Sequence, residues 1–221
     1  MAPRLRRGVL ISIEGGEGSG KSTLAKALER LLREHSYDPL LTHEPAGTPL
    51  GSAVQEILDR AASTGAALAP VAELLLFEAA RAQNVAAVIL PAIESGQIVL
   101  CDRYTDSTLA YQGYGRGLSL DHIRACNHIA TDGLAPQLTL LLDIEPELGL
   151  ARAGRRAEGG VAGMAAIGGD SLEFHRRVRE GFLALAGKDR ERIALISGIL
   201  PASAVVQTAW ERIRGMLERH L

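Results

Sequence analysis

The sequence is poor in the residues that mark secreted, cysteine-stabilised or strongly charged proteins. Cys101 and Cys126 are its two cysteines, too few and too widely separated for a disulfide framework or a cysteine-based metal site. We therefore expect buried thiols in a reducing compartment. The formal net charge is −2, which argues against broad electrostatic binding to nucleic acid or to an anionic membrane.

Two apolar stretches of the sequence could suggest a secretion signal or a membrane span, and the residues in and around them argue against both. The basic start, MAPRLRR, is followed by a short apolar run that leads directly into a glycine-rich loop, which indicates a strand and not a signal peptide. Residues 66–90 are apolar over a long stretch, but Glu73, Glu78 and Arg81 fall within them and argue against a membrane span. The sequence therefore predicts a cytoplasmic protein.

The chain does contain a P-loop pattern, EGGEGSGKST, at residues 14–23. It follows an apolar run at residues 9–13 and precedes a helical pattern, which is the context such a loop requires. Glycines leave backbone N–H groups free to surround phosphates, while the lysine can reach the outer phosphates and the serine can ligate Mg²⁺. A glycine-rich turn that binds nothing is the alternative, and the flanking strand and helix weigh against it. The predicted ATP-binding residues of the loop are Gly15, Gly16, Glu17, Gly18, Ser19, Gly20, Lys21, Ser22 and Thr23.

Strand and helix patterns alternate along the chain. A long helical pattern, residues 70–95, contains Pro91, where we expect a kink or break. Strands separated by helices predict one α/β domain over residues 1–221, with a P-loop NTPase-type parallel five-stranded sheet and helices on both faces. The expected strands are residues 9–13, 39–43, 97–101, 137–144 and 192–196.

Residues 153–170 differ in composition from the rest of the chain, because they contain six glycines and no aromatic residue. A disordered linker is one interpretation. Because the segment lies between two helical patterns inside one domain, we expect a mobile glycine-rich lid.

A second polar motif, CDRYTDSTLAYQGYGRG, begins at the end of the third expected strand. Asp102 lies where α/β sheets place their ligands and can hold Mg²⁺ directly or through water. Arg103 can form a forked contact with a phosphate. An Asp–Arg pair that caps the next helix is the structural alternative.

Together these motifs resemble the thymidylate kinase family, whose members phosphorylate dTMP to dTDP with ATP. The chain carries IEGGEGSGKST, HEPAGTPLG, LLFEAARAQ, DRYTDSTLAYQGYGRG and PQLTLLLDIEPELGLAR in the family's order, over nearly its full length. The resemblance implies a nucleoside monophosphate kinase-like fold, ATP and dTMP as substrates, Mg²⁺ as cofactor and a homodimer.

The resemblance also implies roles for individual residues around dTMP. Phe77 would stack on the thymine ring and Arg81 would reach the base edge; their i, i+4 spacing puts both on one helix face. A core aromatic is the alternative for Phe77. Arg103 would bind the dTMP phosphate, and Glu17 would accept a hydrogen bond from the sugar 3′-hydroxyl. The implied dTMP-binding residues are Glu17, Phe77, Arg81, Arg103, Ser107, Tyr111 and Gln112.

Catalysis requires cations near the transferring phosphoryl group. Lys21 and Arg103 supply two, but the variable positions of the P-loop carry none. The chain thus resembles the branch of the family that places arginines in the lid. We expect Arg155 or Arg156 to close on the phosphate and Arg152 to lie against adenine. A solvated basic helix end is the alternative.

The chain departs from the family pattern in two places. His43 stands where bacterial members commonly have arginine, beside Glu44, which is a possible ligand of a Mg²⁺-bound water or a residue that shapes the turn. The lid lacks the usual Asp-Arg-x-Glu stretch. Two other function classes stay open: a kinase for another nucleoside monophosphate, and a GTPase-type switch. The switch would require an Asn-Lys-x-Asp motif, which the three lysines do not provide.

Overall fold

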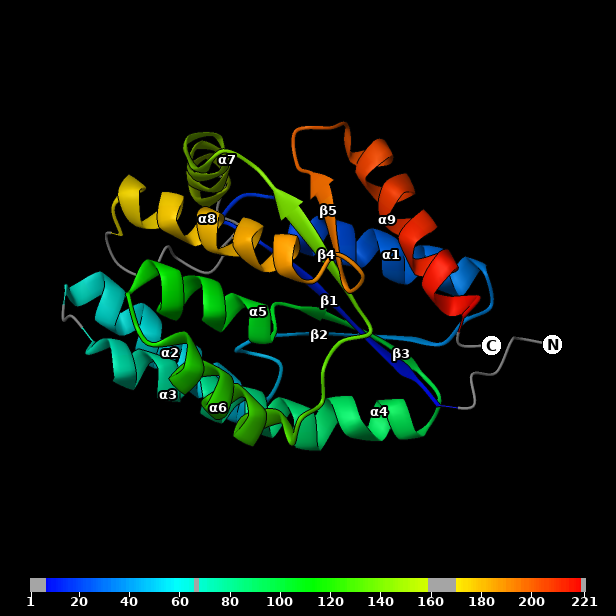
Figure 1. The fold of residues 1–221 in the computed structure, drawn as a ribbon, viewed down its shortest axis with the longest axis horizontal. Coiled ribbons are helices and arrows are strands. Elements are labelled where there is room, and N and C mark those ends of the chain that lie inside the picture. Colours follow the sequence, from blue (N-terminus) through cyan, green and yellow to red (C-terminus); the bar gives the residue numbers. More distant parts are fainter. Residues whose placement is uncertain (1–6, 66–67, 159–169, 220–221) are drawn as a thin grey trace.

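The computed structural model describes residues 7–65, 68–158 and 170–219, and for residues 156–158 it describes the backbone alone. Within these residues, five parallel strands form one sheet in the order β2-β3-β1-β4-β5 (Figure 1). Helical segments cross back between successive strands, which keeps all neighbours parallel. The predicted architecture is confirmed. The strands are β1 (Val9–Gly15), β2 (Pro39–His43), β3 (Ile98–Asp102), β4 (Leu138–Asp143) and β5 (Ile193–Ser197).

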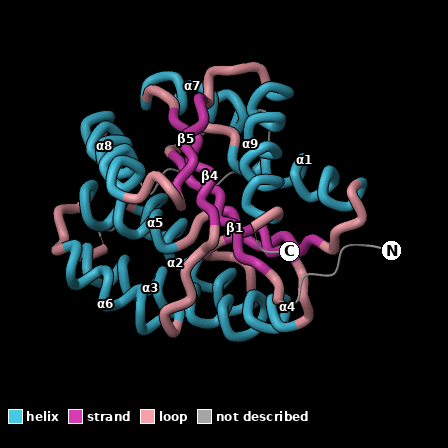
Figure 2. The backbone as a smooth tube through the Cα atoms, turned by 45° about the vertical axis from the view of Figure 1, so that its right-hand side comes forward, coloured by secondary structure: helices cyan, strands magenta, loops and turns pink. Residues whose placement is uncertain are grey.

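Helices cover both faces of this sheet, as Figure 2 shows. On one face, α1 (Lys21–Glu34) and α9 (Ala202–Leu217) pack against Val9, Ile11 and Ile13. Leu10 points to the opposite face, because successive side chains of a strand alternate. That face is covered by α3 (Pro70–Asn84), α4 (Leu90–Glu94), α6 (Leu120–Thr131) and α8 (Leu172–Lys188). The other helices are α2 (Pro49–Thr64), α5 (Thr105–Thr108) and α7 (Pro146–Glu158).

The long helical segment from α3 to α4 continues through Pro91 without a break. A π-helical stretch, η1 (Val85–Ile89), joins the two helices, and the Leu90 N–H donates to the Val85 carbonyl five residues earlier. The proline ring crowds the preceding turn of a regular α-helix, and the wider π turn makes room for it. By length and composition alone, Pro70–Glu94 would suffice to cross a membrane. Its charged residues Glu78 and Arg81, however, are buried against each other inside the protein.

The carboxyl ends of β1, β2 and β3 meet at one edge of the sheet. Asp102 pairs in register with Ile13 of β1 and His43 of β2. β1 extends to Gly15, two residues beyond the predicted end, because Glu14 and Gly15 pair with β4. The motif after β3 forms α5 and a second π-helical segment, η2 (Leu109–Gly115). The P-loop and the second polar motif therefore lie side by side.

Candidate active site

The P-loop packs closely on the start of α7. Gly18 has φ +64°, and a Cβ there would lie 1.9 Å from the Gly149 carbonyl oxygen, so the loop tolerates no side chain at this point. Lys21 is buried, and its Nζ donates to the carbonyl oxygens of Gly15 and Gly16 at 2.9 and 2.8 Å. Burial, together with the neighbouring Arg103, lowers the pKa of Lys21 to about 8. These bonds hold the lysine against the P-loop backbone.

Two of the three predicted metal ligands come together. The Ser22 hydroxyl, at the start of α1, donates to Asp102 Oδ2 at 2.6 Å across the sheet edge. Hydroxyl and carboxylate oxygens form the donor set that Mg²⁺ prefers, so these residues fit that ion. Glu44 follows β2 beside them, but its carboxylate accepts from Arg81 Nε at 2.9 Å instead. No group of three or more His, Cys, Asp or Glu side chains in the described parts of the chain forms a metal cluster.

Six of the seven predicted dTMP-binding residues line one pocket of about 320 Å³. It lies between α3 and the α5–η2 segment and reaches the end of β3. Glu17 of the P-loop does not line it, but contacts two residues that do. The lining residues are Glu44, Phe77, Arg81, Arg103, Ser107, Thr108, Tyr111 and Gln112.

Arg103 joins this pocket to the P-loop. Its Nη2 donates to Glu17 Oε1 at 2.8 Å, and the Tyr111 hydroxyl donates to the same oxygen at 3.0 Å. The guanidinium lies 5.0 Å from the centre of the Tyr111 ring. Burial opposes the charge on Glu17, but Arg103 and Lys21 outweigh it and lower the pKa of this carboxyl.

The backbone of Arg103 is strained. Its φ of +71° lies in the left-handed region, which costs a residue with a side chain about 1–3 kcal/mol. Neighbouring groups hold this conformation: the Arg103 N–H donates to Ile13 O at 3.0 Å, and the Tyr104 N–H donates to Glu14 Oε1 at 2.7 Å. Such strain is typical of functional sites, where it aims a side chain.

Glu14 is a site residue that the sequence analysis missed. It is fully buried at the end of β1, and besides Tyr104 N–H it accepts from the Ser107 hydroxyl at 2.6 Å. Burial, reinforced by Asp106, raises the pKa of Glu14 to about 8. An acidic residue within an otherwise apolar strand was the available signal.

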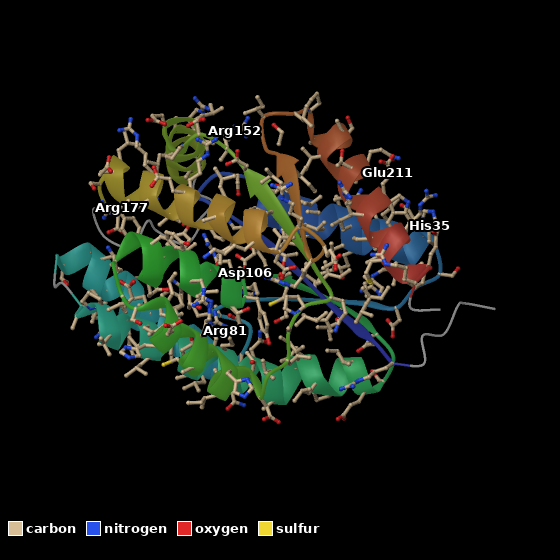
Figure 3. All side chains as sticks on the ribbon, in the orientation of Figure 1. His35, Arg81, Asp106, Arg152, Arg177 and Glu211 are labelled. Atoms are coloured by element: carbon tan, nitrogen blue, oxygen red, sulfur yellow. The ribbon has the colours of Figure 1, made fainter. Side chains whose placement is uncertain are left out.

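Arg81 is held far more tightly than the sequence suggested (Figure 3). It is 1% exposed and donates to Glu44, Glu78 and the Tyr104 carbonyl at 2.9, 2.9 and 3.1 Å. Its Nη1 also reaches Asn127 and Thr108. Burial raises the pKa of Glu44 to about 7 despite the nearby Arg81. Arg81 lines the pocket, and its Nη2 carries two N–H groups, of which one has no hydrogen-bond partner among the described residues.

A second groove, of about 880 Å³, opens on the other side of the P-loop. It combines loop residues with Arg152 and with apolar side chains at the start of α9, such as Val205 and Val206. Arg152 Nη1 donates to the Gly198 carbonyl at 2.9 Å, which holds the arginine at the rim (Figure 3).

The remaining predicted residues are the two lid arginines, the rest of the lid and His43. Arg155, on α7, is exposed and makes no hydrogen bond or ion pair with the described residues. The Arg156 side chain lies outside the described part of the chain, as do residues 159–169 of the expected lid, whose first residues, 153–158, continue α7. His43 is exposed.

Comparison with known proteins gives a consistent result. The family model described as thymidylate kinase matches residues 13–209. A thymidylate kinase from Synechococcus sp. (strain JA-2-3B'a(2-13)) is 48% identical over 209 residues, covering 95% of this chain and 96% of that protein. One from Desulfovibrio desulfuricans is 47% identical over 213 residues, covering 96% and 97%. The crystal structure of thymidylate kinase from Ehrlichia chaffeensis superposes with a TM-score of 0.74 at 30% identity, covering 94% of this chain and 99% of that one. The chain therefore belongs to the thymidylate kinase family.

Proposed function

We propose that this chain transfers the terminal phosphoryl group of ATP to dTMP across the contact between Glu17 and Arg103. The reaction, which gives dTDP and ADP, is that of the thymidylate kinase family to which the chain belongs. The observation that carries the placement of the substrates is the 2.8 Å ion pair from the P-loop residue Glu17 to Arg103. It joins the phosphate loop to the acceptor pocket, as in-line transfer between two bound nucleotides requires.

On the donor side, the triphosphate would lie along the P-loop and adenine in the groove beside Arg152. The N-terminus of α1 and Lys21 would screen the phosphate charge. Ser22 and Asp102 would hold Mg²⁺, which supplies charge neutralisation on the phosphates when it is bound. Glu44 Oε2 is bonded to Arg81, whereas Glu44 Oε1 is buried and has no hydrogen-bond partner among the described residues. This second oxygen would accept a hydrogen bond from a Mg²⁺-bound water.

On the acceptor side, Phe77 would stack on thymine while Arg81 and Gln112 meet its polar edge. Tyr111 would pack against the deoxyribose, where its ring would exclude a 2′-hydroxyl. Glu17 would accept from the 3′-hydroxyl, and Arg103 would bind the acceptor phosphate. Ser107 would order Arg103, to which it lies close, with 3.5 Å between Ser107 Oγ and Arg103 Nη1.

The catalytic cations would be Lys21, Arg103 and an arginine of the lid, residues 153–170. Arg155 is suited to this role because it is exposed near the end of α7 and has no competing partner among the described residues. Arg156 is the second candidate, from its position in the sequence. A cation that contacts the phosphoryl group only in the transition state acts on kcat.

We also propose a cytoplasmic homodimer that binds no nucleic acid or membrane. Val71 and Leu75 on α3 are each 54% exposed, and Leu50 and Ile57 on the adjacent α2 are 46% and 48% exposed. Large apolar side chains gathered on two packed helices are typical of a surface that another protein covers. A second copy of this chain is the partner that the family resemblance implies.

The direct test is ADP release from ATP and Mg²⁺ with a panel of acceptors: dTMP, dUMP, dCMP, dGMP, UMP and AMP. We expect dTMP to give the highest kcat/KM. If another monophosphate is the best acceptor, the assignment of the pocket is wrong. If no acceptor stimulates ADP release, the transfer itself is wrong for this chain.

A further inference from the structure

The orientation of the Gln112 amide follows from a neighbour outside the pocket. Gln112 lines the acceptor pocket, is 1% exposed, and donates from Nε2 to Glu73 Oε1 at 2.7 Å. A carboxylate only accepts hydrogen bonds, so the NH₂ end of the amide must face Glu73. The opposite atom, Gln112 Oε1, makes no hydrogen bond with the described residues. Gln112 Oε1 is therefore the hydrogen-bond acceptor that this residue has available for a ligand in the pocket.

Glu73 is in turn held by Arg116. The Arg116 Nε and Nη2 atoms donate to the two carboxylate oxygens of Glu73 at 3.3 and 3.1 Å. Asp170 accepts from the same guanidinium, which also lies 4.3 Å from the centre of the Phe174 ring. Glu73 is 3% exposed, and this forked pairing keeps its charge compensated and its oxygens in place. The chain of contacts runs from Asp170 through Arg116 and Glu73 to Gln112.

Building on the proposed function, we propose that Glu73 and Arg116 are specificity-determining residues that select thymine by locking the Gln112 amide. Thymine offers an N3–H donor beside the O4 acceptor. The free N–H on Arg81 Nη2 and the Gln112 Oε1 acceptor match that pair of groups. Cytosine presents the reverse pattern, an N3 acceptor beside an amino donor, and would leave buried polar groups unpaired. Neither Glu73 nor Arg116 need touch the base, because both act through Gln112.

The test is to measure kcat/KM for dTMP and for dCMP in the wild-type protein and in the Glu73→Gln variant. The new amide can meet Gln112 with either end, so Gln112 can turn. We expect the dTMP-to-dCMP ratio to fall at least about tenfold, the cost of one mispaired buried group. The matched control is Glu173→Gln, which makes the same chemical change in an exposed pair with 3.8 Å between Glu173 and Arg176; its ratio should equal that of the wild type.

A double variant separates orientation from damage to packing. In Glu73→Gln with Gln112→Glu, the new carboxylate accepts from the new amide and again presents an oxygen to the base. The dTMP-to-dCMP ratio should recover. If Glu73→Gln does not fold, Arg116→Met, which keeps an apolar stem against Phe174, must lower the ratio in the same direction.

The outcomes distinguish this inference from the proposed function. A wild-type enzyme with no preference for dTMP would contradict the proposed function itself. A wild-type preference that persists unchanged in folded Glu73→Gln would overturn the role of Glu73. A ratio that falls and does not recover in the double variant would also overturn it, because Glu73 would then act through packing alone.

Discussion

Replacing Glu14 with glutamine should make the protein more stable at alkaline pH than at acidic pH, relative to the wild type. The pKa of Glu14 is raised to about 8 from an ordinary value of 4.5, first by burial and then by Asp106. Between these values the unfolded chain has lost the proton and the folded chain keeps it. Folding then takes up a proton, so wild-type stability falls as the pH rises through this window.

The size of the effect follows from the width of the window. Each pH unit corresponds to about 1.4 kcal/mol for one proton. A window of about 3.5 units gives about 5 kcal/mol of pH-dependent destabilisation from Glu14. Glutamine has the same shape, can still accept from the Tyr104 N–H, and carries no titratable group. The Ser107 hydroxyl can rotate to accept from the new amide.

The assay is urea unfolding followed by circular dichroism, at several values from about pH 5 to about pH 8 and at fixed protein concentration. The quantity compared is the unfolding free energy of Glu14→Gln minus that of the wild type. The contributions of the other titrating groups cancel in this difference. We expect this difference to rise by about 3–4 kcal/mol over the range, because the three pH units tested cover most but not all of the window. Glu211→Gln, a change to an exposed carboxylate on α9, is the control and should give a flat difference.

A flat difference for Glu14→Gln would refute the reasoning. It would mean that Glu14 is already ionised in the folded protein at about pH 5 and that its hydrogen bonds outweigh its burial. A difference that falls with rising pH would refute it more strongly, because the folded protein would then stabilise the carboxylate.

Other changes test the remaining parts of the site. Arg155→Ala should lower kcat at least about tenfold with little change in KM, measured by steady-state ADP release; a kcat within about threefold of the wild type would remove Arg155 from the mechanism. Asp102→Asn should raise the Mg²⁺ concentration for half-maximal activity at least about tenfold, since it removes a charged oxygen ligand; an unchanged Mg²⁺ titration would place the ion elsewhere. If the proposed homodimer uses this surface, Leu75→Glu should give a species of single-chain mass, 23.5 kDa, in sedimentation. Wild-type protein that already sediments at that mass would contradict the homodimer.

The sequence was most informative where the physical cause is local. The P-loop needs glycines, a lysine and a hydroxyl within one short stretch between a strand and a helix, and all of these can be read directly. The strands were located because β-branched and apolar runs are bounded by turn residues. The family resemblance implied seven dTMP-binding residues, and six of them line one pocket.

The sequence was less informative where a polar group pairs across a long separation. Arg81 was expected at the base edge, but its partners Glu44 and Asn127 are 37 and 46 residues away and occupy most of its donors. Glu44 was expected near the metal, and the sequence did not indicate that one of its oxygens is bonded to Arg81. At Pro91 the helical segment does not break, and a π-helical stretch that the sequence did not predict precedes the proline.

Motif and periodicity thus predicted the α/β class and the phosphate loop, and the resemblance of the motifs indicated the family of this protein. The tertiary structure alone decided which buried polar atoms meet: Glu14 with Tyr104 and Ser107, and Gln112 with Glu73. Periodicity reports that a face is buried, because apolar residues recur on it. Periodicity does not predict which polar side chains form hydrogen bonds with each other, because the partner comes from whichever element packs against that face. A buried polar group without a partner costs free energy of folding.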